Sequence, residues 1–245
     1  MAETIASVIV GLVRLVIAWQ LLRLWRQQRL SNLFWLAVMF VINALAPMLR
    51  STAGGWPALA GWGATLAQLC LCLFIHQTFY RERRSPWPFF LAASAAGLII
   101  VTAFTLRALD SEVPLYYILL VDLTSGLIAV LNWSWHALAA YQAYARLATE
   151  ATLADWIKAR YRLMVAYSIL MILPILGLIG NSLGPTPQLP LIMLSIVSML
   201  ASICLQYAVW AMPESLRRFL NRHYLPLAET LPLSDSHLPQ QSQNG

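Results

Sequence analysis

Long apolar stretches alternate with short polar connections along most of the chain. Seven of them approach or exceed the length of about 20 residues that a helix needs to cross a bilayer, and they cover residues 4–24, 32–50, 57–80, 87–107, 114–145, 162–183 and 189–212. Turn-forming sequences such as STAGGWP and NSLGPTPQLP separate several of them. The pattern predicts an all-α, polytopic membrane protein built as a bundle of seven transmembrane helices.

The remaining sequence predicts two further regions after a transmembrane domain at residues 1–212. Residues 213–225 contain PESLRRFLNRHY, which places apolar side chains on one helical face and arginines on the other. This segment is expected to lie on the membrane surface, and its proposed contacts with lipid or a partner are Arg217, Arg218, Phe219 and Arg222. Residues 226–245 are polar and predict a disordered tail.

Composition supports a membrane protein, because 60% of the 245 residues are hydrophobic and only 11% are charged. A soluble domain has about 25% charged residues. Most of the 16 Lys and Arg residues follow the first, third, fifth and seventh stretches. The positive-inside rule then predicts an outside N-terminus and a cytoplasmic C-terminus. The first stretch lacks a basic n-region and a cleavage site, so we expect a retained span. The expected location is a bacterial inner membrane.

Polar residues in the fifth stretch share one helical face. With about 100° of rotation per residue, Asp122, Ser125, Asn132 and His136 lie in one seam, together with Gly126, Ala129, Trp133, Ala140 and Ala143. The opposite side carries a lipid face of Leu120, Leu123, Leu127, Leu131, Trp135 and Leu138. Because a lipid-facing surface is apolar, the seam is expected to face the interior of the bundle.

Arg14 and Asp122 are the two charges well inside the predicted spans. Both lie roughly 12–15 Å below the outer ends of their helices, and an unpaired charge there costs at least about 2.5–3.5 kcal/mol. We expect them to pair or to share a water-filled cavity in the outer half of the bundle. A purely structural ion pair, a ligand or proton site that includes Ser125 and Asn132, and a protonated Asp122 with an outward-reaching Arg14 remain open.

Two histidines lie in the cytoplasmic half of the predicted bundle. Facing histidines on two helices can hold haem iron, so haem b ligated by His76 and His136 is one hypothesis. The alternative is that each imidazole hydrogen-bonds to a neighbouring helix. No cofactor is predicted otherwise, and Cys70, Cys72 and Cys204 lie within spans without a disulfide or metal-ligand pattern.

Pro47 and Pro174 lie within predicted spans and are candidate hinges. A proline has no N–H to donate to the carbonyl four residues earlier and tends to kink its helix. The carbonyls freed in this way are those of Asn43 and Leu170.

Seven spans, an outside N-terminus and a cytoplasmic surface helix at 213–224 resemble the layout of receptor-type seven-helix proteins. Microbial rhodopsins share this layout but need a retinal-binding lysine in the last span. The sequence here, LPLIMLSIVSMLASICLQYAVWAM, has none, and the sole lysine is Lys158, so retinal is rejected. The layout is also similar to the seven-helix sensor regions of bacterial signalling proteins. That resemblance covers residues 1–225 by arrangement and implies a sensor.

The leading hypothesis is a seven-helix sensor or ligand-binding protein with an outer-half polar cavity. It would act on a cytoplasmic signalling partner through 147–161 and 213–224. The second hypothesis is a small, proton-coupled transporter that uses Asp122, and the third is a haem-binding redox subunit. The predicted partners are the lipid bilayer and that signalling protein, with no nucleic acid. An enzyme is least expected, because no paired carboxylates, Ser-His-Asp set or metal-ligand cluster is present.

Overall fold

The computed structural model describes residues 2–50, 57–80, 85–110, 112, 114–148, 155–183, 189–211 and 214–220, and these form helices without a strand. The helices are α1 (Ala2–Gln28), α2 (Ser31–Arg50), α3 (Pro57–Phe79), α4 (Trp87–Asp110), α5 (Pro114–Ala148), α6 (Asp155–Leu183), α7 (Leu189–Ala211) and α8 (Glu214–Leu220). The apolar periodicity therefore predicted each long helix close to its observed bounds. The tail predicted at 226–245 lies outside the described residues.

Six of these helices are long and apolar enough to cross a membrane, so the chain has the architecture of a multi-pass membrane protein. Their qualifying segments are Val8–Gln28, Pro57–Phe79, Trp87–Asp110, Pro114–Ala148, Asp155–Gly177 and Met193–Trp210. Helix α2 is not among the six, because its apolar segment Ser31–Ala46 is shorter than the others. Large apolar side chains such as Leu12, Ile99 and Leu127 are exposed on the outer surface of the bundle, as expected of a surface that faces lipid.

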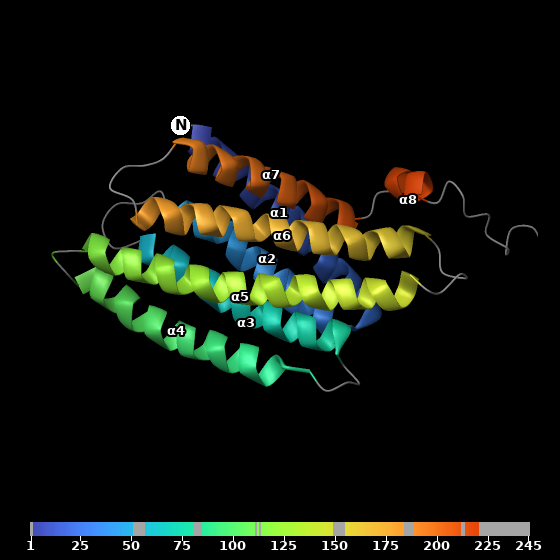
Figure 1. Ribbon diagram of the computed structural model, residues 1–245, viewed down its shortest axis with the longest axis horizontal. Coiled ribbons are helices and arrows are strands. Elements are labelled where there is room, and N and C mark those ends of the chain that lie inside the picture. Colours follow the sequence, from blue (N-terminus) through green and yellow to red (C-terminus); the bar gives the residue numbers. More distant parts are fainter. Residues whose placement is uncertain are drawn as a thin grey trace, which may run out of the picture.

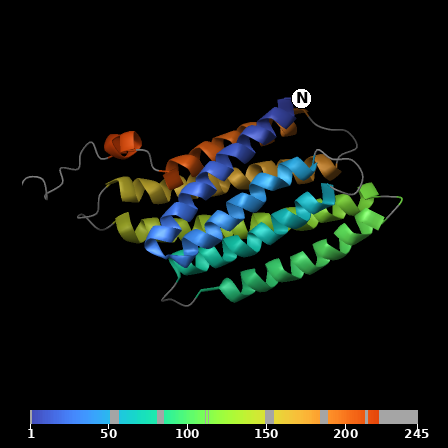
Figure 2. The same cartoon turned by 180° about the vertical axis from the view of Figure 1, so that it is seen from behind.

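The long helices run up and down beside one another (Figure 1). Helices α1, α2 and α3 form one row and α5, α6 and α7 a second row, which Figures 1 and 2 show from opposite sides. Contacts of α3 with α5 and of α1 with α7 join the two rows at both edges. These six helices thus form a closed six-helix ring, and α4 packs outside it against α3 and α5.

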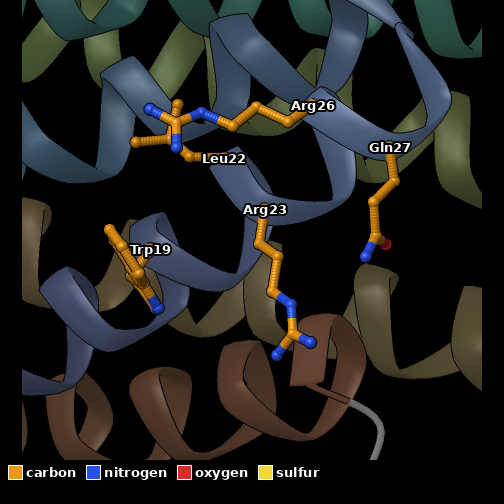
Figure 3. A pocket seen from close by; sticks show the side chains of 5 residues that line it. All are labelled: Trp19, Leu22, Arg23, Arg26 and Gln27. Carbon is orange, nitrogen blue, oxygen red and sulfur yellow. The ribbon is translucent and has the colours of Figure 1, made fainter.

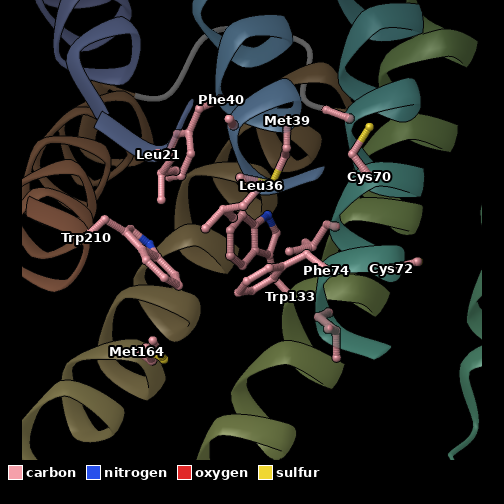
Figure 4. Packing of buried hydrophobic residues seen from close by; sticks show 14 of the residues in the cluster. Leu21, Leu36, Met39, Phe40, Cys70, Cys72, Phe74, Trp133, Met164 and Trp210 are labelled. Atoms are coloured by element: carbon pink, nitrogen blue, oxygen red, sulfur yellow. The ribbon is translucent and has the colours of Figure 1, made fainter. Parts of the chain in front are cut away.

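The core fills the inside of the six-helix ring. Each of its helices contributes a buried side chain, as Figure 4 shows for Leu21, Phe40, Phe74, Trp133, Met164 and Trp210. Helix α4 instead buries the smaller side chains Ser94, Val101, Thr105 and Ala108 against its two neighbours. The ring is therefore the structural unit that positions the polar residues of α5.

The two ends of the bundle are packed differently. We call the end near Arg26, Arg146 and Arg162 the basic end, because α1 and α5 finish there and α6 begins there. Near it the interior is aromatic, whereas the opposite half relies on glycines at helix crossings. A methyl group added at Gly61 of α3 would overlap Val121 of α5, and one added at Gly177 of α6 would overlap Ser195 of α7. Such close backbone approach is typical of membrane helix pairs.

The connection between α1 and α2 is only two residues long. Helix α1 ends at Gln28, and Arg29 adopts a left-handed conformation with φ of 55°. The N–H of Arg29 donates to the carbonyl of Trp25 at 2.7 Å, which closes the last turn of the helix. This tight turn holds α1 and α2 antiparallel.

Candidate functional site

Helix α5 contributes three buried polar side chains to the described part of the bundle, as many as α7 does. Ser125, Asn132 and His136 are 6%, 0% and 0% exposed, and Gly126, Ala129, Trp133 and Ala140 of the same seam are also buried. The prediction of an inward-facing seam on this helix is therefore confirmed. The seam points at α3, α4 and α6, the three neighbours of α5.

The expected lipid face of α5 needs one correction. Trp135 was assigned to that face, but it is only 2% exposed. Its ring stacks on Phe90 of α4 with centroids 4.3 Å apart and on Tyr80 with centroids 6.1 Å apart. The physical reason is that α4 packs outside the six-helix ring and covers this side of α5. Leu127 and Leu138 remain exposed, as predicted.

His136 joins α5 to α6 through both ring nitrogens. Ser168 donates its hydroxyl proton to the carbonyl of Met164 at 2.6 Å. Its oxygen then accepts from the Nδ1–H of His136, also at 2.6 Å. The other nitrogen, Nε2, is left to accept from the hydroxyl of Tyr167 at 3.3 Å. The two neighbouring positions on α6 therefore satisfy a neutral imidazole completely.

Aromatic rings enclose this imidazole. Phe74 stacks on it at 5.9 Å between centroids, and Phe79, Trp133 and Tyr167 approach within 5.5–5.7 Å. These rings come from α3, α5 and α6. We call this group, with Ser168, the His136 cluster. This cluster fills the interior of the six-helix ring near the basic end with closely packed side chains.

Asn132, one turn earlier, makes a second polar cluster on the α4 side of α5. Its Nδ2 donates to Ser94 Oγ at 2.8 Å, and its Oδ1 accepts from Cys72 Sγ at 3.3 Å. Cys72 and Ser94 also contact each other at 3.5 Å. All three side chains are fully buried. This Asn132 cluster ties α4 to the ring, because its members come from α3, α4 and α5.

Asp122 and Ser125 face α3 in the half of the bundle away from the basic end. The space above Gly61 opens onto both side chains, each with an oxygen 3.6 Å from where a methyl group on Gly61 would stand. Ser125 Oγ also donates to the backbone carbonyl of Asp122 at 3.2 Å. The absence of a side chain at Gly61 therefore makes room for this acidic position against α3.

Arg14 has a different neighbour from the one expected. Its Nη1 donates to the backbone carbonyl of Asn43 on α2 at 2.9 Å, and the side chain is 9% exposed. Helix α1 packs on α2 and α7, whereas Asp122 on α5 lies against α3. The structure therefore does not bring Arg14 and Asp122 together. Instead, Arg14 occupies the carbonyl that Pro47 leaves without its helical donor.

The two membrane histidines lie in separate environments. The ring of His76 stacks on Trp87 at the start of α4 with centroids 4.8 Å apart, while His136 contacts α3 and α6. His76 Nδ1 is buried without a hydrogen-bond partner in the described part of the chain. Haem ligation by His76 and His136 stays a hypothesis. It would require His136 to give up Tyr167 or Ser168.

The remaining site residues concern helix shape and the membrane surface. Helix α6 continues through Pro174. For Pro47 only the helical backbone is described, and a hinge role for either proline stays a prediction. In α8, Arg218 pairs with Glu214 one turn earlier, and Phe219 is 56% exposed. The side chain of Arg217 and all of Arg222 lie outside the described residues.

Two of the cavities in the described part of the chain lie along α1 and between α3 and α4, and neither of these is lined by Arg14 or Asp122. One of about 170 Å³ lies along α1 near the basic end and is lined by Trp19, Leu22, Arg23, Arg26 and Gln27 (Figure 3). The other, of about 240 Å³, lies between α3 and α4 and is lined by Leu59, Trp62, Thr102, Thr105, Leu106 and Leu109. The predicted outer-half polar cavity around the two charges is not one of these.

Comparisons with protein-family models, with curated proteins and with solved structures found no match for this chain. The residues of α5 were found from the sequence, because polar positions at helical spacing stand out in an apolar run. Their partners Cys72, Ser94, Tyr167 and Ser168 were missed as a site, because single polar residues on other spans carry no signal of which helix they face. Asn43 was identified only as a freed carbonyl.

Proposed function

We propose that this chain is a seven-helix sensor or ligand-binding protein of a bacterial inner membrane, with its basic end in the cytoplasm. Arg23, Arg26, Arg146 and Arg162 lie at that end, and α8 follows α7 there (Figure 1). The positive-inside rule favours this orientation. It leaves the glycine-rich half of the bundle, with Asp122, toward the outside.

The proposal treats α2 as the seventh span. The helix has 20 residues, which corresponds to about 30 Å, the thickness of the hydrocarbon core. It packs along both α1 and α3. Leu36, Ala37, Met39 and Phe40 are buried in the core of the ring. A helix integrated in this way has to share the membrane depth of its neighbours.

The packing of the His136 cluster is the observation that favours a sensor over a carrier. A carrier needs a polar path that reaches both faces of the membrane. Near the basic end, however, the Asn132 and His136 clusters fill the seam of α5, and their buried polar groups bond to neighbouring helices. A sensor needs no such path. It requires only that a change in the outer half alters how α5 and α6 pack.

The same cluster supports transmission to the cytoplasm. His136 links α5 to α6, and the basic ends of these two helices flank the proposed partner segment 147–161. Helix α8 contacts α6, so the second proposed segment, 213–224, adjoins the same helix. A shift between α5 and α6 would therefore reach both segments at once, which is how a packed, two-state helix pair transmits a signal.

Cysteine accessibility tests this proposal. Ser125→Cys, Ala140→Cys and Ala145→Cys are introduced singly after Cys204, the exposed native cysteine, is replaced by Ser. Each variant is treated with a membrane-impermeant thiol reagent in right-side-out cells and in inverted vesicles. The sensor predicts that Ala140→Cys, at a fully buried seam position, stays unmodified in both. Ala145→Cys, at an exposed position, is modified in inverted vesicles only.

The matched positions make each outcome informative. Modification of Ala140→Cys in inverted vesicles at a rate near that of Ala145→Cys would mean an aqueous path from the cytoplasm, and the carrier would replace the sensor. Modification of Ala145→Cys in intact cells would reverse the proposed orientation. Ser125→Cys reports separately whether the outer half admits water beside Asp122.

A further inference from the structure

The cavity on α1 is lined by residues that have no role in the proposed sensor function. Its lining residues, Trp19, Leu22, Arg23, Arg26 and Gln27, follow one another at intervals of three, one, three and one. This spacing places them all on one face of the helix. Figure 3 shows the side chain of Arg26 running toward the Trp19 end of the cavity and that of Arg23 extending away from the axis of α1.

Both guanidinium groups in this cavity lack a partner among the residues that the structure describes. Arg23 and Arg26 make no hydrogen bond or ion pair within the described part of the chain. Other arginines do have partners: Arg160 lies over the ring of Trp210, Arg162 donates to Tyr144, and Arg218 pairs with Glu214. The cavity therefore presents two positive charges without a counter-charge in the described part of the chain, and the Gln27 amide adds a further donor.

The cavity also continues onto an apolar surface. Below it on the same side of α1, Leu12 and Val16 are 55% and 49% exposed, and Trp19 is 67% exposed. Trp19 and Arg26 are seven residues apart, which is roughly 10 Å along the helix. An indole at this depth is typical of the level where acyl chains meet headgroups, so the arginines reach the level of the lipid phosphate.

We infer that this cavity binds the phosphate headgroup of an anionic phospholipid. The two arginines hold the phosphate oxygens in charge-assisted hydrogen bonds, for which the guanidinium geometry is well suited. Trp19 covers the glycerol region, and the acyl chains lie along Val16 and Leu12. A free phosphate ion would satisfy the same arginines, but it would leave the adjoining apolar face without an occupant. The inference requires membrane insertion and is independent of the sensor role.

The binding test uses the full-length chain in a neutral detergent and native mass spectrometry. Phosphatidylglycerol and phosphatidylcholine with identical acyl chains are titrated in parallel. The wild type is expected to bind phosphatidylglycerol preferentially. Arg23→Gln with Arg26→Gln should weaken its affinity about 5- to 25-fold, since each basic residue at an anionic surface contributes about a factor of five. The control, Arg107→Gln with Arg162→Gln, removes two charges elsewhere, one of them at the basic end, and should keep the preference.

A second readout places the lipid on α1. Phosphatidylglycerol with brominated acyl chains should quench tryptophan fluorescence more strongly in the wild type than in Trp19→Phe. Arg23→Lys with Arg26→Lys preserves both charges and should retain binding. This pair provides the measurement if the Arg→Gln pair does not fold.

Three results would overturn the inference. They are an unchanged preference for phosphatidylglycerol in the folded Arg→Gln pair, equal loss in the control pair, and quenching that is independent of Trp19. Millimolar inorganic phosphate provides the last arm. If it displaces the lipid completely, the site recognises a free phosphate ion and the assignment to a phospholipid is wrong.

Discussion

Arg14 donates a hydrogen bond from Nη1 to the backbone carbonyl of Asn43, 2.9 Å away on the neighbouring helix. Pro47, four residues after Asn43, has no N–H to give to that carbonyl. An arginine deep in an apolar bundle thus supplies the donor that the proline removed. This hydrogen bond gives a structural reason for the buried charge of Arg14, for which the sequence had predicted an ion pair.

The hydrogen bond from Arg14 to the Asn43 carbonyl predicts that removing Arg14 costs less stability when Pro47 is also replaced. Arg14→Met should lower the free energy of unfolding by about 1.5–3 kcal/mol, the contribution of a charged hydrogen bond. In a Pro47→Ala background the helix regains its own N–H donor to Asn43, so the same substitution should cost measurably less. Unfolding in mixed micelles with increasing SDS measures both values. Equal costs in the two backgrounds would show that Arg14 does not compensate for the proline.

Arg14 and Asp122 should act independently. Because one lies against α2 and the other against α3, the stability changes caused by Arg14→Met and Asp122→Asn are expected to add within about 0.3–0.5 kcal/mol. The measurement is a double-mutant cycle in the same unfolding assay. A larger coupling energy would restore the ion pair that the sequence suggested.

The His136 cluster predicts that removing all of its polar groups is milder than removing one. Ser168→Ala leaves the Nδ1–H of His136 buried without an acceptor and should cost about 1–3 kcal/mol. Adding His136→Phe and Tyr167→Phe removes the imidazole together with the hydroxyl that donates to it, and leaves apolar rings among Phe74 and Trp133. The triple variant should therefore be more stable than Ser168→Ala alone. If it is less stable, the imidazole contributes by something other than these hydrogen bonds.

The Asn132 cluster can be tested with two buried serines. Ser94→Ala deprives Asn132 Nδ2 of its acceptor on another helix and should cost about 1–2 kcal/mol. Ser198 is similarly buried, but within the described residues its hydroxyl bonds to backbone carbonyls of its own helix at Leu194 and Ser195. Ser198→Ala should therefore change stability by less than about 0.5 kcal/mol. Similar losses for both would indicate that the contact between helices adds nothing.

Two glycines on α3 should respond in opposite ways to the same substitution. A methyl group at Gly61 would overlap Val121, so Gly61→Ala should destabilise the protein by about 1–3 kcal/mol. At Gly63 the added atom would lie 3.6 Å from Ile42, an ordinary contact, and alanine should be neutral or stabilising by up to about 1 kcal/mol. Val121→Ala should relieve the first effect. Thermal unfolding in detergent distinguishes these outcomes.

Sequence patterns predicted the helices well because membrane spans depend on length and apolarity, which a single chain records directly. The inward face of α5 was predicted for the same reason. Trp135 was misassigned because nothing along the chain reveals that α4 packs on that side. Arg14 was matched with Asp122 by depth and charge, whereas its observed partner is a backbone carbonyl. Contacts between helices depend on how they are arranged, and residue spacing within one span does not encode that arrangement.

The contact between α1 and α7 closes the six-helix ring with the two long helices that are farthest apart in the chain. During synthesis, the helices α1, α2 and α3 can pack as each enters the bilayer, because neighbours in sequence are neighbours in space. The side of α1 that contacts α7 can be covered only after α7 has been synthesised. The order of the helices in the chain therefore implies that α7 displaces lipid from this side of α1 late in assembly.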